Sequence, residues 1–218
     1  MRVTLNTGTP AELAVPTSGV ARRGLVLWPD IGGLRPLFDD HCARLADEQG
    51  WVVCAPEPFP GLEHLTLEER LAYVGNFDDD AKLADAVAAA DATGIEPVGV
   101  IGFCMGGMYA MKCAASDRFD RVVAFYGMIR LPEHWRGPGQ GDAVDSVRIA
   151  PEKVMAIIGT ADHWTPPDHV AELEATGATV VRYEGAEHGF VHVPERPAHR
   201  PVDAADAWAR AIAFLNGN

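Results

Sequence analysis

The stretch 97–108 constrains the fold of this chain more than any other, because a strand pattern changes there into a helix pattern within a few residues. An apolar, β-branched run ends at Gly102, Cys104 stands on the turn, and Gly106 follows as the helix pattern begins. The two glycines let strand and helix approach where a Cβ atom would clash. This Gly-x-Cys-x-Gly pattern is typical of a nucleophile elbow, which holds a reactive side chain above the edge of a sheet.

The elbow pattern has a second interpretation, because glycine-rich turns join strands to helices in many α/β proteins and buried cysteines usually serve as small apolar residues. Two residues further along the chain favour catalysis. Asp162 follows a strand-like run at 153–159, and His188 lies in a Glu-x-His-Gly-Phe loop before the last helix pattern. Nucleophile, acid and histidine follow one another in this order in α/β-hydrolases. The sequence therefore predicts a catalytic triad of Cys104, Asp162 and His188.

The triad predicts a particular reaction. His188 is the expected base, and Asp162 orients it. The thiolate of Cys104 attacks an ester or lactone carbonyl, a thioester holds the acyl group, and water activated by His188 releases the acid. The oxyanion formed on the way needs amide donors. We expect them to be the amides of Met105, directly after the nucleophile, and of Ile31, in the glycine loop after the first buried strand run.

The chain resembles the dienelactone hydrolase family over nearly its whole length. The residues that carry the resemblance are Gly102-Phe103-Cys104-Met105-Gly106-Gly107, Gly159-Thr160-Ala161-Asp162 and His188-Gly189-Phe190. The resemblance implies a single α/β-hydrolase domain over residues 1–218, with a mainly parallel sheet, helices on both faces and no cofactor. The implied activity is that of a carboxylic ester hydrolase acting on a small ester, lactone or thioester.

The resemblance also implies a role for Asp30. Family members carry a glutamate in the loop after the first core strand, and it participates in forming the thiolate when substrate binds. Asp30 occupies the matching position here and is one methylene shorter. Its side chain either performs the same function at altered reach or caps its own loop.

Family members that hydrolyse dienelactone hold its carboxylate with arginines, one of which lies four residues after the catalytic histidine. His192 occupies that position in this chain, while Arg70 and Arg130 lie in loops from which a second anchor could reach the substrate. The resemblance with one arginine missing implies a neutral acyl substrate rather than dienelactone itself. Phe59 and Tyr73 lie in the irregular segment 56–75, where they either line the pocket or pack beneath it.

Alternating strand and helix patterns predict the same architecture independently of the resemblance. We expect short irregular strands within residues 1–20 and a long loop at 127–150. The other expected strands lie at 23–28, 51–55, 97–103, 121–126, 153–159 and 179–183, and the expected helices at 36–50, 77–93, 105–115, 166–176 and 203–215. His163 and Trp164 directly follow the acid of the triad and are expected to border the pocket.

The net charge and the cysteines indicate which partners and which compartment to expect. The net charge is −13 without a basic run, which disfavours nucleic acid and anionic membranes as partners. Neither a signal-peptide pattern nor an apolar run of membrane-spanning length is present in the sequence. The four cysteines form no CxxC pair and are expected to be reduced thiols of a cytoplasmic monomer or homodimer. His188 and His192 lack a third ligand, so no metal site is expected.

Two alternative functions stay open at this point. One is a catalytically silent relative that binds a small ligand, and the other is a redox-sensing thiol protein. A catalyst forms an acyl-enzyme with an activated ester, a silent binder does not, and a sensor oxidises reversibly without esterase activity.

Overall fold

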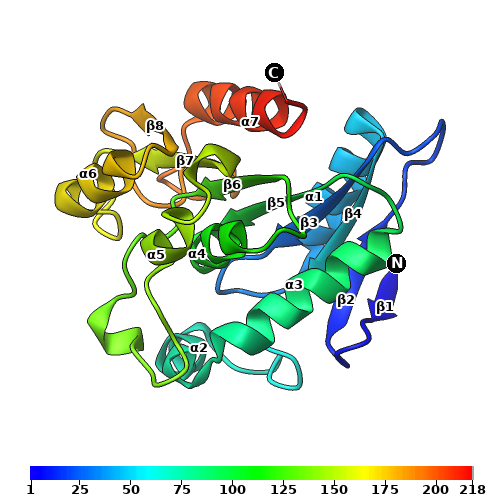
Figure 1. The fold of residues 1–218 in the computed structure, drawn as a ribbon, viewed down its shortest axis with the longest axis horizontal. Coiled ribbons are helices and arrows are strands. Elements are labelled where there is room, and N and C mark those ends of the chain that lie inside the picture. The colour runs from blue at the N-terminus through cyan, green and yellow to red at the C-terminus, as the bar shows by residue number, and fades with distance from the viewer. Residues whose placement is uncertain (218) are drawn as a thin grey trace.

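The computed structural model describes residues 1–217, and its centre is one eight-stranded sheet (Figure 1). The strands lie in the order β1-β2-β4-β3-β5-β6-β7-β8. Their bounds are β1 Arg2–Thr4, β2 Pro10–Ala14, β3 Arg23–Trp28, β4 Trp51–Pro56, β5 Val98–Phe103, β6 Arg121–Phe125, β7 Val154–Gly159 and β8 Thr179–Tyr183. Strands β3 to β8 run parallel to one another, whereas β1 and β2 form a hairpin that joins β4 antiparallel.

Helices cover both faces of the sheet, which confirms the expected architecture. Their bounds are α1 Pro36–Gln49, α2 Leu67–Tyr73, α3 Asp79–Thr93, α4 Met105–Lys112, α5 Ala143–Val147, α6 Pro167–Ala175 and α7 Pro201–Leu215. Buried residues of α1 and α7 form one core, and those of α3 to α6 form a second core on the opposite face. Strands β3, β5 and β7 are buried along their whole length between the two cores, as expected for continuous apolar runs.

The sequence patterns locate most elements to within two residues of their observed ends. The segment 127–150 differs, because it contains helix α5 and a 3₁₀ turn at Glu133–Trp135 within the expected loop. Helix α5 has five residues, too few to show a helical period, and it forms because three apolar side chains are buried in the core, Ala143, Val144 and Val147.

The arrangement of the sheet determines where a site can form. The parallel strands point their carboxyl ends to one edge, where the loops after β3, β5, β7 and β8 carry Asp30, Cys104, Asp162 and His188. In Figure 1, α2 and the loop that precedes α5 lie together at the lower left. Within residues 1–217, no helix combines the length and apolar character needed to cross a bilayer.

Candidate active site

Cys104 stands at a sharp turn between β5 and α4. Its backbone has φ 57° and ψ −121°, a conformation that side-chain-bearing residues rarely adopt and that costs about 1–3 kcal/mol. A Cβ atom on Gly102 would lie 2.1 Å from the carbonyl oxygen of Gly106, and one on Gly106 would lie 2.2 Å from that of Pro29. Both glycines are therefore required, and the turn has the geometry of a nucleophile elbow.

His188 and Asp162 form the pair that the sequence predicts beside this cysteine. Nδ1 of His188 lies 2.7 Å from Oδ2 of Asp162, whose side chain is buried. The other carboxylate oxygen accepts the backbone N–H of Trp164 at 2.8 Å. With Nδ1 bonded to the carboxylate, Nε2 is the ring nitrogen left for a reacting group, and it makes no hydrogen bond within residues 1–217. Cys104 and His188 line the same cavity.

The protonation of His188 suits this arrangement. Burial is the strongest influence and lowers the pKa of His188, whereas the hydrogen bond that His188 donates to Asp162 and the neighbouring Cys104 side chain raise it, to about 10. His188 is therefore a doubly protonated imidazolium at neutral pH in the free protein. An imidazolium beside a thiol stabilises the thiolate form.

Neither of the two expected oxyanion donors is used by another hydrogen bond in the described residues. Ile31 lines the cavity, and in the described part of the chain its N–H donates to no other group. Met105 is the first residue of α4, so its N–H has no acceptor within the helix. Both amides are thus available, and their role in catalysis stays a prediction.

The cavity at the elbow has a volume of about 360 Å³, and its lining contains two chemically different groups of residues. One group is apolar and comprises Leu67, Leu71, Trp135 and Trp164. The two indole rings stack at 5.3 Å between centroids with an interplanar angle of 21°. The other group is polar and comprises Asp30, Arg35, His192 and Arg196. The cavity therefore offers both apolar and charged side chains to a small acyl or leaving group.

Asp30 is buried and fully engaged. Its carboxylate accepts two hydrogen bonds from Arg35, at 2.6 and 2.8 Å, and one from the backbone N–H of Gly32 at 2.8 Å. Nε2 of His192 lies 2.7 Å from the same carboxylate. Burial raises the pKa of Asp30, but the hydrogen bonds from His192 and Arg35 and the charge of Arg35 outweigh it and hold this pKa well below its usual range. Asp30 does cap its own loop, and its participation in thiolate formation stays a prediction.

His192 is enclosed, with 1% of its surface exposed. Its ring stacks on Phe103 at 4.9 Å, and its Nδ1 is hydrogen-bonded to the Tyr126 hydroxyl. Burial is the main cause that lowers the pKa of His192, so the ring is neutral at neutral pH. Nε2–H then donates to Asp30, and Nδ1 accepts from Tyr126. Sequence reasoning missed Tyr126, whose φ of 40° lies, like that of Cys104, in a region that favours glycine.

Two aromatic residues, for which the sequence leaves open either the pocket or the packing beneath it, lie outside the cavity. Phe59 does not line the cavity, because its ring is fully buried 4.9 Å from that of Phe77. Tyr73 packs against Phe77 at 5.9 Å and also lies outside the cavity wall. Helix α2 presents Leu67 and Leu71 to the cavity in place of Tyr73. Trp164 borders the cavity as expected, whereas His163 lines only a second, more open hollow of about 530 Å³ beside it.

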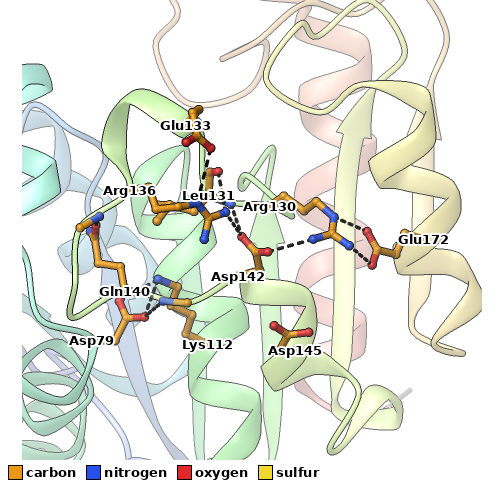
Figure 2. A network of polar contacts seen from close by, with 12 residues as sticks. Asp79, Lys112, Arg130, Leu131, Glu133, Arg136, Gln140, Asp142, Asp145 and Glu172 are labelled. Carbon is orange, nitrogen blue, oxygen red and sulfur yellow. Dashed lines mark hydrogen bonds and ion pairs between the residues drawn. The ribbon is translucent and has the colours of Figure 1, made fainter.

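The two arginines considered as anchors do not reach the cavity either. Arg70 is buried and donates to the carbonyl oxygens of Leu65 and Glu63, at 3.0 and 2.6 Å. Arg130 is bound by two carboxylates, those of Asp142 and Glu172 (Figure 2). Each guanidinium is held by nearer acceptors, so the anchor roles expected for both are not supported.

Two other arginines line the cavity, and sequence reasoning missed them. Arg35 follows the glycine loop after β3, and its charge is balanced by Asp30. Arg196 lies at the rim eight residues after His188, and no carboxylate of residues 1–217 forms an ion pair with it. The available sequence signal for Arg196 was a basic residue after His188. Whether such a residue reaches the cavity depends on the path of the loop between the two.

The same geometry gives no indication of a metal centre. Over residues 1–217, no three His, Cys, Asp or Glu side chains are grouped so that they could hold a metal ion.

Comparison with known proteins agrees with the fold. The model of the dienelactone hydrolase family matches residues 10–218. A carboxymethylenebutenolidase from Rhodococcus opacus is 28% identical over 88% of this chain and 79% of its own length. Carboxymethylenebutenolidase 2 from Cupriavidus pinatubonensis is 31% identical over 81% of this chain and 78% of its own. The crystal structure of a candidate dienelactone hydrolase from Klebsiella pneumoniae superimposes with a TM-score of 0.83 at 24% identity, covering 100% of this chain and 98% of that one.

Proposed function

The chain belongs to the dienelactone hydrolase family, and we propose that it hydrolyses a small ester, lactone or thioester through Cys104, His188 and Asp162. One observation carries the proposal. The histidine of an aspartate–histidine pair at 2.7 Å lines the same cavity as a cysteine held at positive φ. The names of the two relatives, both butenolidases, favour an ester or lactone as substrate.

The first half of the reaction is acylation. The Cys104 thiolate attacks the carbonyl carbon, an S–C bond forms, and the carbonyl electron pair moves onto oxygen. The amides of Ile31 and Met105 stabilise this oxyanion. When the intermediate collapses, the bond to the leaving group breaks, and the leaving oxygen or sulfur takes the proton from Nε2 of His188. With a lactone, the released hydroxyl stays attached to the acyl group.

The second half is hydrolysis of the thioester. His188, now neutral, takes a proton from water, and the hydroxide attacks the thioester carbon. Collapse of the second oxyanion breaks the S–C bond, and Cys104 leaves as a thiolate beside the imidazolium. Asp162 holds the ring in one tautomer throughout, because Nδ1–H donates to its carboxylate.

The charges around the cavity support a neutral acyl group. Asp30 already binds the guanidinium of Arg35 with two hydrogen bonds. His192 is buried and neutral, so it offers no permanent charge to a substrate carboxylate. We therefore propose neutral substrates in preference to acids such as dienelactone.

A panel of p-nitrophenyl esters, lactones and thioesters, followed by mass spectrometry of the enzyme, tests the proposal. Wild type should hydrolyse at least one of them and carry a transient acyl mass on Cys104, and Cys104→Ala should abolish both. Matched controls are Cys42→Ala, Cys54→Ala and Cys113→Ala, because burial raises the pKa of each of these thiols. Activity of Cys104→Ala close to that of wild type would refute the assignment.

The same measurements separate the two alternatives. Binding without an acyl adduct would identify a silent relative. Reversible oxidation of Cys104 without hydrolysis of any ester would identify a thiol sensor.

A further inference from the structure

A buried carboxylate outside the triad holds the loop that carries the expected oxyanion donor. Glu57 follows β4, and 2% of its surface is exposed. Its Oε2 accepts the backbone N–H of Leu34 at 2.9 Å, and its Oε1 accepts that of Phe59 at 2.8 Å. One side chain thus joins the loop after β3 to the segment after β4. A buried N–H that loses such a partner finds no water to replace it, which makes the attachment firm.

Arg70 completes this attachment from α2. It is 7% exposed, and its Nη1 lies 3.9 Å from Oε1 of Glu57. The same nitrogen donates to the carbonyl oxygen of Ile31 at 3.4 Å. The guanidinium also lies 4.9 Å from the centre of the Phe59 ring, and it is fixed by its bonds to the chain that leads into α2. The Arg70 guanidinium is therefore held by the chain before α2 and donates to the loop 30–34 after β3.

The loop backbone lies directly on this pair. Gly33 has φ +70°, and a Cβ atom there would lie 2.4 Å from Nη1 of Arg70 and 2.7 Å from Oε1 of Glu57. On its cavity side the same loop presents Ile31 beside Cys104. The orientation of the Ile31 backbone thus depends on the two buried side chains behind it.

We propose that Glu57 and Arg70 are positioning residues for the oxyanion hole, acting through the loop 30–34 to aim the N–H of Ile31 at the developing oxyanion. The inference rests on the proposed function, because it assigns these residues to the acylation step of that reaction. Neither side chain lines the cavity, so neither touches the substrate.

The expected effect is on kcat rather than on KM. Removing one oxyanion donor outright reduces kcat by about 10²–10³-fold, and a displaced donor should lose part of this, about 10–100-fold. Arg70→Met removes the charge and the bond to Ile31. Glu57→Gln places an amide NH₂ against one of the two backbone N–H groups and breaks that bond. KM should stay within about threefold of wild type in both variants, because the cavity wall is unchanged.

Alkylation of Cys104 by iodoacetamide distinguishes a displaced oxyanion hole from a damaged site. In this reaction an S–C bond forms as the C–I bond breaks, iodide leaves, and no oxyanion develops. The rate therefore reports the thiolate and His188 without the oxyanion hole. We expect the ratio of the acylation rate to the alkylation rate to fall about 10–100-fold in both variants, with the alkylation rate itself nearly unchanged.

Two further variants serve as rescue and control. Arg70→Lys keeps a cation opposite Glu57 and should recover part of the lost ratio. Arg23→Met removes another buried arginine of similar setting, which pairs with Asp120 at the opposite end of the sheet. It should lower the melting temperature without changing the ratio. Should Arg70→Met fail to fold, Glu57→Gln carries the test.

The outcomes separate the two proposals. A wild-type protein that hydrolyses esters, with variants that keep its ratio or lose acylation and alkylation equally, would overturn the inference alone. A wild-type protein that is alkylated at Cys104 but hydrolyses no ester would overturn the proposed function and this inference with it.

Discussion

Two histidines, each paired with an aspartate, line the same cavity, and their surroundings give them opposite protonation. Burial lowers the pKa of His188, but its neighbours Asp162 and Cys104 raise it to about 10. His192 has a carboxylate on one ring nitrogen and a Tyr126 hydroxyl on the other, and its near-complete burial lowers its pKa. In the proposed reaction His188 therefore holds a proton for the leaving group, whereas His192 is a neutral hydrogen-bonded support for Asp30.

The raised pKa of His188 predicts a pH-dependent contribution to stability. A histidine with a folded pKa above its ordinary value stabilises fully below about pH 6.5 and loses this contribution as the pH rises through about 10. Asp162→Asn removes a main cause of the raised pKa. The difference in free energy of unfolding between wild type and Asp162→Asn, measured with urea, should be largest near about pH 6 and shrink toward about pH 10. A difference independent of pH would show that His188 is not protonated in the folded protein.

Asp30→Asn tests whether this carboxylate participates in thiolate formation. If it does, kcat and kcat/KM for a p-nitrophenyl ester should fall together by about 10²-fold, because the group acts in the transition state. Arg35→Gln is the matched control, since it removes a partner of Asp30 but keeps the carboxylate. A variant that loses only thermal stability would identify Asp30 as a loop cap and nothing more.

Among single residues, Cys104, Asp162 and His188 were recognisable from their positions along the chain, and the structure brings His188 into contact with Asp162 and into the same cavity as Cys104. The sequence offers Phe59, Arg70 and Arg130 only as candidates for the pocket, and each has a nearer partner that the sequence does not reveal. Tyr126 escaped notice because its role depends on a contact with His192, 66 residues away in the chain. Side-chain direction in loops is determined by such distant partners.

At the scale of elements, the segment 127–150 brings Trp135 to the cavity and is held by a network of charges (Figure 2). Asp142 is its centre and accepts the Leu131 N–H at 2.9 Å and guanidinium groups of Arg130 and Arg136, both also at 2.9 Å. Arg130 continues to Glu172 on α6. The position of the aromatic wall therefore depends on ion pairs that lie outside the cavity.

Asp142→Ala should loosen this wall. We expect KM for an aryl ester to rise about three- to tenfold, with kcat nearly unchanged, because binding area is lost while the triad is intact. Asp145→Ala is the control, since its ion pair with Arg148 is exposed and does not involve Asp142. Added salt should also raise the KM of wild type, as Asp142→Ala does, because salt screens partly exposed ion pairs. Equal KM values in Asp142→Ala and wild type would show that the segment is held by packing alone.

Strand and helix patterns predicted the alternating elements well, because each long element shows several periods of its apolar face. They did not predict how the segment 127–150 is ordered. Its partners Asp79 and Glu172 belong to two separate helices, α3 and α6, and no local pattern links them to it.

At the scale of the whole molecule, the net charge of −13 and the polar side of the cavity bear on substrate charge. Arg196 is the side chain best placed to bind a substrate carboxylate, because it lies at the cavity rim and forms no ion pair within the described residues. We expect kcat/KM for a carboxylate-bearing lactone to be below that for its methyl ester in wild type. Arg196→Gln should lower the ratio by only a few-fold, as an exposed charge contributes about 1 kcal/mol or less.

The ratio of kcat/KM for the carboxylate-bearing lactone to kcat/KM for its methyl ester also has an outcome that would contradict the proposal of neutral substrates. A wild-type value far above one that collapses in Arg196→Gln and falls with added salt would identify Arg196 as a carboxylate anchor. Acids resembling dienelactone would then be the leading substrates.

The positive φ of Cys104 affects which substitutions at this position stabilise the protein. A strained backbone of about 1–3 kcal/mol is a sizeable share of a typical folding stability of about 5–15 kcal/mol. A glycine at position 104 would relieve that strain and destroy the nucleophile in one step. Among descendants that no longer needed the thiol, such replacements would spread, because they leave a larger stability reserve for other mutations. A cysteine at this strained position is therefore what we expect of a protein that uses its thiol as the proposed nucleophile.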